Sequence, residues 1–348
     1  MTDTRSRVTL QDVADRAGVS ITTASRVVND GSRRVGAQLA QRVHQAAAEL
    51  GYTANLQARA VATGRSSMVG VVVHDIADPY FSSIVAGLIA VADTSRLLVC
   101  MSSTPASEAA ERHYVALMRA QRARAVILIG SRTGDAPARA ALAQELAAFA
   151  RQGGRAVCVG QPLLDVDTIV PENVAGADAL ARALAALGHR RFAVLAGPHG
   201  LLTAQDRVEG FRAGLAGWPA VLDPASIVHG AFTRDGGYEA MSSILAAGGA
   251  RPDCVFAVND VMAVGALARL RAAGLAVPGD IAVAGFDDIL TLRDVTPPLT
   301  TVRLPLRRMG EMAANLVLAE GDPDRPRVIP VPGEVIIRDS TLPRRPPG

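Results

Sequence analysis

The sequence contains no lysine. All 36 basic residues among its 348 positions are arginine, and alanine is very abundant, which indicates coding bias and carries no functional argument. Only three cysteines are present, Cys100, Cys158 and Cys254, and they stand far apart in apolar stretches. Because this spacing fits neither a disulfide framework nor a CxxC metal site, we expect buried thiols in a reducing compartment.

Long apolar runs are also missing. No stretch approaches the roughly 20 residues of a membrane span, and residues 1–10 are polar without the apolar core of a secretory signal. Apolar residues nevertheless make up 49% of the chain against 20% charged residues, which favours a folded chain over disorder. We therefore expect a globular, cytoplasmic protein with two or three domains.

Signatures of catalysis are lacking as well. The chain has no GxSxG nucleophile elbow, no GxxxxGK[ST] phosphate loop and no HExxH metal motif. Its six histidines are scattered without helical metal spacing, and Asp287 and Asp288 are adjacent rather than facing, which argues against an acid–base pair. We expect no enzyme activity, no catalytic residues, no bound metal and no cofactor.

Positive charge is concentrated near the N-terminus. Residues 1–66 hold nine arginines against five acidic residues, although the whole chain carries a net charge of only +3. A basic segment on a nearly neutral body is typical of a protein in which that segment alone meets a polyanion. A solvated basic surface without a partner would give the same count, so the local pattern must decide.

That local pattern predicts three short helices. Apolar residues from Leu10 to Ala17 recur at helical spacing after the N-cap Thr9, and Gly18 ends this first helix. A second helix follows Ser20, and a third ends near Gly51. The second helix has an inner face of Ala24, Val27 and Val28 and an outer face of Ile21, Thr22, Ser25, Arg26 and Asn29. Small residues at the helix crossing favour a helix-turn-helix, with a plain three-helix bundle as the alternative.

From residue 67 the pattern changes to alternating strands and helices. Short apolar runs predict strands at 69–73, 97–100, 125–129 and 156–159, and a second series at 192–195, 254–258 and 281–284. Helical stretches at 79–93, 107–121 and 137–152 favour right-handed crossovers on parallel sheets, so the body consists of two doubly wound halves. A ligand binds such sheets beyond the carboxyl ends of the strands. The segments expected there are 74–81, 160–161, 197–207, 259–260 and 287–288.

These residues carry a resemblance to a known family. The run VTLQDVADRAGVSITTASRVVN at 8–29 resembles the helix-turn-helix of the LacI (lactose-repressor-like, LacI/GalR) family of bacterial transcription regulators. Further similar blocks follow in the family's order over nearly the whole chain. They are ELGYTANLQARAVATGRS at 49–66, VGVVVHDIADPYF at 69–81, ENVAG at 172–176, LGHRRFAVLAGP at 187–198, TAQDRVEGF at 203–211, VFAVNDVMAVGAL at 255–267, VPGDIAVAGFDD at 277–288 and TPPLTTVR at 296–303.

The resemblance implies three parts. These are an all-α helix-turn-helix headpiece at 1–52, a hinge at 53–66, and an α/β periplasmic-binding-protein-like core at 67–348 for effector binding and dimerisation. The core would consist of two doubly wound parallel-sheet subdomains, an N-subdomain at about 67–171 and 303–328 and a C-subdomain at about 172–302 and 329–340. The C-terminal stretch 341–348 has no heptad pattern, so we expect a homodimer without a tetramerising coiled coil.

The resemblance also implies DNA-binding positions in the headpiece and hinge. Ser20 would cap the recognition helix, Ile21, Thr22 and Arg26 would face base edges, and Thr23, Ser25 and Asn29 would lie at phosphates. Arg26 can donate two hydrogen bonds to a guanine edge. Two departures, Ala24 for a larger β-branched residue and Gly36 for a capping hydroxyl, indicate a less stable headpiece. Further DNA contacts are implied for Thr9, Leu10, Asn55, Ala58 and Val61.

For the core, the resemblance implies an effector in the cleft between the subdomains. The matching positions are Tyr80, Phe81, Gly160, Arg207, Phe232, Asn259 and Asp287, and their side chains suit a sugar, because carboxylates accept from hydroxyls and aromatic faces cover a sugar ring. Gly160 and Gln161 replace a charged ligand contact, which leaves the sugar's identity open. Tyr80 and Phe81 as plain core aromatics, and Asp287 as a helix cap, are the alternatives.

We therefore predict a transcriptional regulator, a repressor, that binds pseudo-palindromic double-stranded operator DNA as a homodimer under the control of a small-molecule effector, a sugar. Effector binding would change the relation of the subdomains and bias the hinge between ordered and disordered states. The alternatives are a regulator with a non-sugar effector such as a purine, and a sugar-binding protein without a DNA role.

Overall fold

The computed structural model describes residues 8–30, 35–53, 66–248, 250–319 and 325–342. By its internal contacts the chain divides into two compact units, Met1–Ser67 and Met68–Gly348. No helix in the described ranges has the length and apolar character needed to cross a membrane.

The described part of the first unit is helical. It consists of α1 (Leu10–Ala17), α2 (Ile21–Asp30) and α3 (Ala37–Leu50). Their inward residues Val13, Ala24, Val27 and Val43 are almost fully buried and form one small core. Gly18 ends α1 with φ of 64°, a left-handed conformation that a residue with a Cβ adopts only under strain. The three helices and the turn at Gly18 are thus confirmed.

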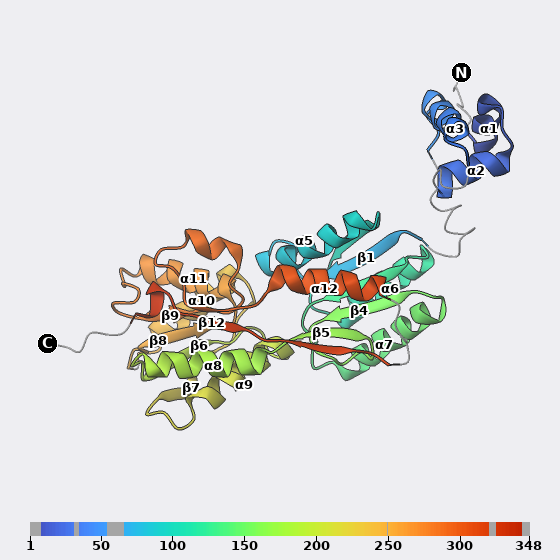
Figure 1. The fold of residues 1–348 in the computed structure, drawn as a ribbon. Helices are drawn as coiled ribbons and strands as arrows, with labels where there is room; N and C mark the ends of the chain where they lie inside the picture. The colour runs from blue at the N-terminus through green and yellow to red at the C-terminus, as the bar shows by residue number, and fades with distance from the viewer. Residues whose placement is uncertain (1–7, 31–34, 54–65, 249, 320–324, 343–348) are drawn as a thin grey trace, which may run out of the picture. The chain divides into compact units, whose positions relative to one another are not determined.

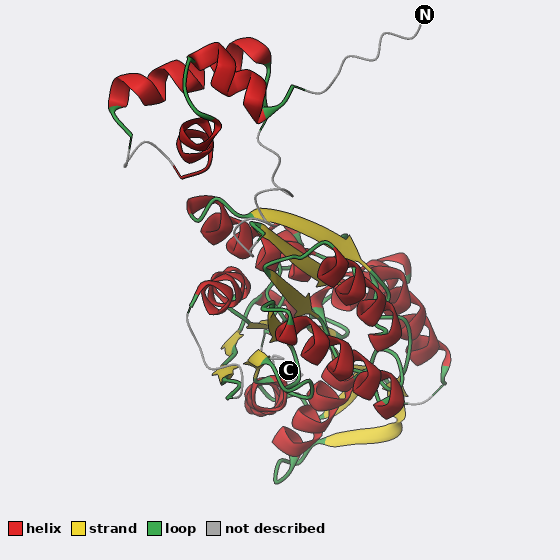
Figure 2. Cartoon of the chain, turned by 90° about the vertical axis from the view of Figure 1, so that its right-hand side faces the viewer, coloured by secondary structure: helices red, strands yellow, loops and turns green. Residues whose placement is uncertain are grey.

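The second unit begins with a six-stranded parallel sheet in the order β11-β5-β4-β3-β1-β2. Its strands are β1 (Met68–Val73), β2 (Leu98–Ser103), β3 (Ala125–Ile129), β4 (Arg155–Val159), β5 (Asp167–Pro171) and β11 (Val328–Val331). Its helices are α5 (Pro79–Thr94), α6 (Glu108–Ala120), α7 (Ala136–Arg151) and α12 (Leu306–Leu318). The side chains of β3 alternate between two cores: Ile127 packs with α5 and α12, and Val126 packs with α6 and α7, so helices cover both faces of the sheet (Figure 2).

A second, four-stranded parallel sheet follows in the order β7-β6-β8-β9. Its strands are β6 (Arg191–Leu195), β7 (Val221–Val228), β8 (Cys254–Ala257) and β9 (Ala282–Ala284), and its helices are α8 (Asn173–Ala186), α9 (Leu202–Leu215), α10 (Arg234–Ala246) and α11 (Asp260–Ala272). The short 3₁₀ turns Leu290–Asp294 and Asp339–Thr341 complete this half. Figure 1 shows the two sheets as the centres of two α/β subdomains.

The chain crosses between the subdomains three times. It leaves the first sheet after β5, returns through β10 (Thr301–Arg303) to α12 and β11, and crosses again through β12 (Glu334–Ile336), which pairs antiparallel with β10. Because β11 pairs with β5, the last passage into the second subdomain lies beyond Val331, later than the boundary expected near 328. Multiple crossings let the subdomains move relative to each other without separating.

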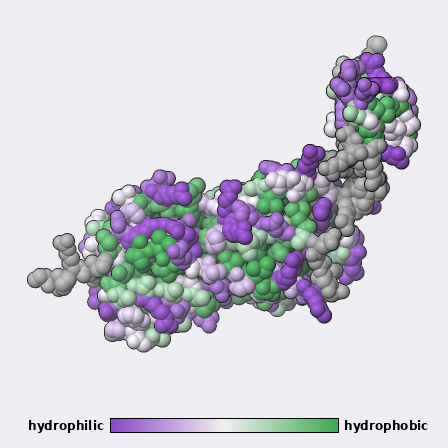
Figure 3. Space-filling view, in the orientation of Figure 1, coloured by the Kyte–Doolittle hydropathy of each residue, from purple (hydrophilic) through white to green (hydrophobic). Residues whose placement is uncertain are grey.

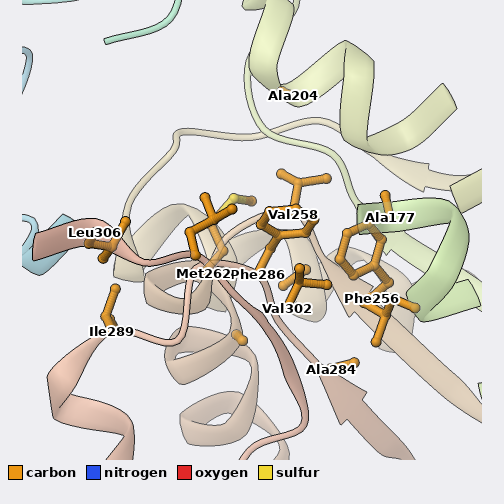
Figure 4. Close-up of a cluster of buried hydrophobic side chains, with 14 of the residues drawn as sticks. Ala177, Ala204, Phe256, Val258, Met262, Ala284, Phe286, Ile289, Val302 and Leu306 are labelled. Carbon is orange, nitrogen blue, oxygen red and sulfur yellow. The ribbon is translucent and has the colours of Figure 1, made fainter. Parts of the chain in front are cut away.

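A continuous apolar core reaches the crossing strands. Phe256, Val258, Met262 and Phe286 pack with Val302 of β10 and with other fully buried side chains (Figure 4). Outside this core, apolar residues on the surface occur as separate patches among polar residues (Figure 3). Cys158 and Cys254 are buried as expected, and burial raises the pKa of the Cys158 thiol to about 11. Cys100, on the edge strand β2, is only half-buried, which corrects the expectation for that thiol.

Candidate functional site

The first helix of the headpiece begins with a reciprocal cap. The Thr9 hydroxyl accepts from the backbone N–H of Asp12 at 3.3 Å, and the Thr9 N–H donates to the Asp12 carboxylate at 2.8 Å. The backbone hydrogen bond from Thr9 lowers the pKa of Asp12. Thr9 itself is exposed, whereas Leu10 packs against the headpiece core. Of these two expected DNA contacts, Thr9 is therefore exposed and Leu10 is half-buried.

The second helix has the two faces that its sequence predicts. Ser20 accepts from the backbone N–H of Thr23 at 3.1 Å, which caps α2. Ile21 is 47% exposed, Thr22 and Arg26 are also exposed, and Thr23 and Ser25 are half-buried. Gly36, by contrast, begins α3 without a side-chain cap. The structure thus turns an apolar, a hydroxyl and a cationic side chain outward on one short helix.

Four of the expected DNA-binding positions have no described side chain. The backbone of Asn29 belongs to α2, but its side chain is outside the described part of the structure. Asn55, Ala58 and Val61 lie outside the described residues altogether. Their DNA contacts remain predictions from the sequence.

A cavity of about 220 Å³ lies between the subdomains of the second unit. Most of the residues that line it lie at the carboxyl ends of strands of both sheets or in the loops and helices that follow them, as the strand-end rule predicts. Six of the seven expected effector-binding residues are among them: Tyr80, Phe81, Gly160, Arg207, Phe232 and Asp287. The strand ends also bring His74, Asp75, Asp78, Gly130, Ser131, Asn173 and Thr203 to the cavity.

Arg207 and Asp287 form a buried ion pair in the wall of the cavity. The Nη2 of Arg207 donates to Oδ1 of Asp287 at 2.7 Å, its Nε donates to Asn173 at 2.9 Å, and its Nη1 donates to the carbonyl of Val258 at 2.6 Å. The guanidinium also lies 3.9 Å from the ring centre of Phe286. Burial raises the pKa of Asp287, and the charge and hydrogen bond of Arg207 act in the opposite direction. Asp287 faces Arg207 rather than capping a helix.

Aromatic rings cover the apolar side of the cavity. Tyr80 and Phe81, at the start of α5, meet edge to face with ring centres 5.1 Å apart, and His74 lies 5.9 Å from Phe81. Phe232 contributes a ring from the other subdomain. Phe81 also belongs to the main core, so it serves both packing and the cavity. Burial raises the pKa of the Tyr80 hydroxyl, which therefore keeps its proton as a hydrogen-bond donor.

His74 contacts a buried ion pair between Glu111 and Arg132, which the sequence does not reveal. Its Nε2 lies 3.0 Å from Oε1 of Glu111, and Arg132 contacts both oxygens of the same carboxylate, with Nη2 at 2.7 Å from Oε1. Burial alone would raise the pKa of Glu111, but hydrogen bonds from His74 and Arg132 hold it below its usual value. Glu111 is therefore a carboxylate that only accepts, so the Nε2 of His74 carries a proton.

Gly160 and Gln161 have different tasks in the structure. Gly160 lines the cavity with φ of 154°, and a Cβ there would lie 2.3 Å from the carbonyl oxygen of Gly130. Gln161 points elsewhere: its amide accepts from the backbone N–H of Arg132 and donates to Thr203 at 3.0 Å and Asp206 at 3.1 Å. Gly160 thus packs directly against the backbone of Gly130, and Gln161 links the two subdomains.

Two acidic or amide positions near the cavity have structural partners instead. Asn259 is 1% exposed, caps α11 through the backbone N–H of Met262, and does not line the cavity. Its Nδ2 has no partner among the described residues. Asp288 accepts from Arg303 and Arg338, both at 2.7 Å, and these arginines belong to the crossing segments. Asp287 therefore points to the cavity, and Asp288 points to the segments that cross between the subdomains.

Main-chain hydrogen bonds also join the subdomains at one lip of the cavity. The N–H of Gly134 donates to the carbonyl of Gly200 at 3.1 Å, and the N–H of Leu202 donates to the carbonyl of Arg132 at 3.0 Å. The N–H of Thr203 adds a bond to the Ser131 hydroxyl at 2.9 Å. Within the described ranges, no group of three or more His, Cys, Asp or Glu residues has the geometry to hold a metal ion. The arrangement suits reversible binding of a polar ligand.

Comparisons with known proteins agree with both units. The description "Bacterial regulatory proteins, lacI family" matches residues 9–55, and "Periplasmic binding protein-like domain" matches residues 181–341. The regulator GalR of Escherichia coli K12 is 33% identical over 90% of this chain and 89% of its own length. The solved Lac repressor dimer bound to operator and the anti-inducer ONPF has a TM-score of 0.81 at 29% identity and covers 97% of this chain and 100% of its own.

The solved complex of the regulator CelR with cellobiose is similar as well, with a TM-score of 0.68 at 30% identity over 96% of this chain and 100% of its own. These findings confirm the expected fold of a helix-turn-helix unit followed by a periplasmic-binding-protein-like core. The relatives are transcriptional regulators and not enzymes. The chain belongs to the LacI family of bacterial DNA-binding transcriptional regulators.

Proposed function

We propose that the protein is a cytoplasmic, homodimeric repressor that binds a pseudo-palindromic operator and releases it or tightens on it when a sugar occupies the cavity. The observation that carries this proposal is the presence, in one chain, of an outward-facing helix α2 with Ile21, Thr22 and Arg26 and of a cavity with a buried Arg207–Asp287 pair.

The exposed face of α2 supports sequence-specific reading. An α-helix fits the DNA major groove, where arginine can donate two hydrogen bonds to guanine and apolar groups can contact the methyl group of thymine. Arg26 and Ile21 offer these two chemistries on the same face. Two headpieces of a dimer would enter successive major grooves, and the other arginines of residues 1–66 would supply phosphate contacts. Asn55, Ala58 and Val61 are proposed to contact the operator centre.

The edge of the first sheet supports dimerisation. β2 is the outermost strand, and its apolar residues Leu98 and Met101 are 54% and 45% exposed. An open edge strand with exposed apolar side chains favours association with another surface. Arg96, just before this strand, has φ of 53° at the short connection after α5, so the backbone of this face is tightly turned.

The cavity supports a sugar as effector. Carboxylates and a guanidinium can bond hydroxyl groups, while Tyr80, Phe81 and Phe232 can cover the apolar face of a ring. Among the relatives, CelR is seen in complex with cellobiose. Asp287 pairs with Arg207 at the cavity, and its neighbour Asp288 bonds the crossing segments, so an occupant at Asp287 would influence how the subdomains are joined.

The test is to select operator fragments from genomic DNA with the purified chain and to measure binding to them by fluorescence anisotropy with each member of a sugar panel. We expect a pseudo-palindromic site, two chains per site, and a sugar that changes the affinity. Leu98→Arg should give monomers by light scattering and weaken operator binding, whereas Arg112→Ala, a change on helix α6, should do neither. Equal affinity for operator and random DNA would contradict the proposal.

A further inference from the structure

The charged groups of the cavity are mostly acidic. Three carboxyl groups, Asp75, Asp78 and Asp287, line it against the guanidinium of Arg207. The chain has no lysine that could add a positive charge. Asp75 and Asp78 each use one oxygen on a nearby backbone N–H, of Ala77 at 2.8 Å and of Tyr80 at 2.9 Å, which leaves the other oxygen without a partner among the described residues. The lining therefore presents hydrogen-bond acceptors to an occupant.

The guanidinium of Arg207 already has protein partners. Asp287 neutralises its charge, and three of the five N–H groups of an arginine are used by Asp287, Asn173 and the carbonyl of Val258. The two remaining N–H groups can still donate to a neutral hydroxyl. An anion at this place would compete with Asp287 for the same positive charge and would meet the other carboxylates at close range.

The other basic side chains near the cavity also have protein partners. Arg132 is fully buried and contacts both oxygens of Glu111, and the Nε2–H of His74 donates a hydrogen bond to the same carboxylate. A helix N-terminus is the usual alternative for binding a phosphate, and the first N–H groups of α9 are already used. At α9, the N–H groups of Leu202 and Thr203 donate to the Arg132 carbonyl and the Ser131 hydroxyl.

Size adds a second restriction. The cavity measures about 220 Å³, which is below the roughly 300–1,000 Å³ typical of pockets for drug-sized ligands. Gly160 and Gly130 lie against each other without space for a side chain, and the lip bonds at Gly134 and Leu202 close one side. A ligand with one ring fits this volume better than a ligand with two.

We propose that the cavity selects an uncharged, hydroxyl-rich molecule of a single ring and rejects its phosphorylated and carboxylated derivatives. This inference rests on the proposed effector role of the cavity and narrows it. Ligand hydroxyls donate to the free oxygens of Asp78 and Asp287, the spare N–H groups of Arg207 and the amide of Asn173 donate to ligand oxygens, and the rings of Tyr80, Phe81 and Phe232 cover the ring faces.

The test is titration calorimetry on the full chain with a matched panel. One arm contains neutral single rings: aldohexoses, ketohexoses, pentoses and inositol. The second arm contains their phosphate esters and uronic acids, and the third contains cellobiose and lactose. We expect binding in the first arm, with the anionic counterpart weaker by about a hundredfold or more. Tighter binding of an anionic ligand or of a two-ring sugar than of the neutral single ring, or no binding in any arm, would overturn the proposal.

Two variants make the charge argument specific. Asp78→Asn keeps the oxygen that accepts from the backbone N–H of Tyr80 but removes a negative charge. It should therefore weaken binding of the neutral ligand and reduce the ratio of its affinity to that of the phosphate ester by about tenfold. Asp223→Asn, an equivalent change at an exposed position of β7, should leave both affinities unchanged. An unchanged preference in Asp78→Asn would contradict the role of lining charge.

Operator binding by the same preparation separates this inference from the proposed function. If the neutral ring binds but the affinity for the operator does not change, the effector role fails and the selectivity stands. If operator binding responds to an anionic ligand, the effector role stands and the selectivity fails.

Discussion

The guanidinium of Arg207 and the carboxylate of Asp287 meet at 2.7 Å with both side chains almost completely buried. Arg207 comes from α9 and Asp287 from the loop after β9, so the pair joins two strand-end segments of the second subdomain at the cavity. Because Asn173 and the carbonyl of Val258 also accept from Arg207, protein groups hold the polar wall of the cavity in this arrangement.

This pair predicts different outcomes for two substitutions at one position. Asp287→Ala leaves the buried charge of Arg207 without a partner and should lower the free energy of unfolding by about 3–5 kcal/mol. Asp287→Asn keeps an acceptor for Arg207 and should be destabilised less, while the effector response is lost in both. Urea denaturation and operator titrations with and without effector test this, with the exposed Asp235→Asn as control. A normal response in Asp287→Asn would remove Asp287 from the site.

Arg26 is predicted to read a base. Because its side chain is exposed on the outer face of α2, Arg26→Ala should cost about 1–3 kcal/mol at the specific operator and leave binding to random DNA nearly intact. Gel-shift titrations on both DNAs measure the two effects. Arg16→Ala, which removes an exposed ion pair with Glu49 on α1 and α3, should change both affinities by a similar factor. Equal weakening by Arg26→Ala would assign Arg26 to phosphate.

The hinge prediction rests on the sequence, since Val61 lies outside the described residues. The family resemblance places a leucine wedge for the minor groove at this position, and Ala54 replaces a proline before it. Valine is one methylene shorter and β-branched, so Val61→Leu should tighten operator binding by about 1 kcal/mol and increase the DNA bend. Anisotropy and circular-permutation assays compare the two proteins. No change in either would show that residue 61 is not a wedge.

The buried ion pair beneath His74 predicts a non-additive pair of substitutions. Glu111→Gln leaves the fully buried Arg132 uncompensated and should lower the free energy of unfolding by about 3 kcal/mol. Replacing both residues, with Glu111→Leu and Arg132→Met, should recover at least half of the lost free energy of unfolding, because no unpaired charge remains. Denaturant titrations of the single and double variants give the coupling. A single-variant loss below about 1 kcal/mol would contradict a strong pair.

Asp260 predicts a pH dependence of stability. It is fully buried and accepts from Ile289 and Thr301, and burial raises its pKa from 3.8 to about 6. The native state therefore binds this proton more tightly than the unfolded chain, and the contribution to stability is fully present below about pH 4 and lost as the pH rises to about 6. The free energy of unfolding of Asp260→Asn, relative to the unchanged protein, should rise by on the order of 2 kcal/mol from about pH 4 to 7. A pH-independent difference would contradict this prediction.

The buried strands could be predicted from the sequence because their apolar runs are continuous. The run at 125–129 coincides with β3, and 192–195 differs from β6 by one residue. Two of the four edge strands, β7 and β11, could not be predicted in this way, whereas the edge strands β2 and β9 overlap the apolar runs at 97–100 and 281–284. β7 is largely exposed and contains Asp223 and Pro224, and β11 is exposed at Val328, so neither has the continuous apolar run of a buried strand.

The candidate cavity was predictable where the strand-end rule applies and not where tertiary packing decides. Together with the family resemblance, the rule places Arg207 and Asp287 near each other from the amino-acid sequence alone. It does not reveal that Glu111, on a helix with polar neighbours, turns inward to His74 and Arg132. It also does not separate Asn259, which follows a strand but caps α11, from a ligand-binding amide.

The lip of the cavity has a consequence for mutagenesis. Gly134 and Leu202 join the two subdomains through backbone N–H groups, to the carbonyls of Gly200 and Arg132. Alanine scanning changes side chains and retains those groups, so a scan of this rim would leave these two hydrogen bonds in place. Proline at position 134 or 202 removes the donor itself, and an ester in place of either amide does so with less steric change. Backbone-directed chemistry is therefore the means to learn how firmly the rim holds.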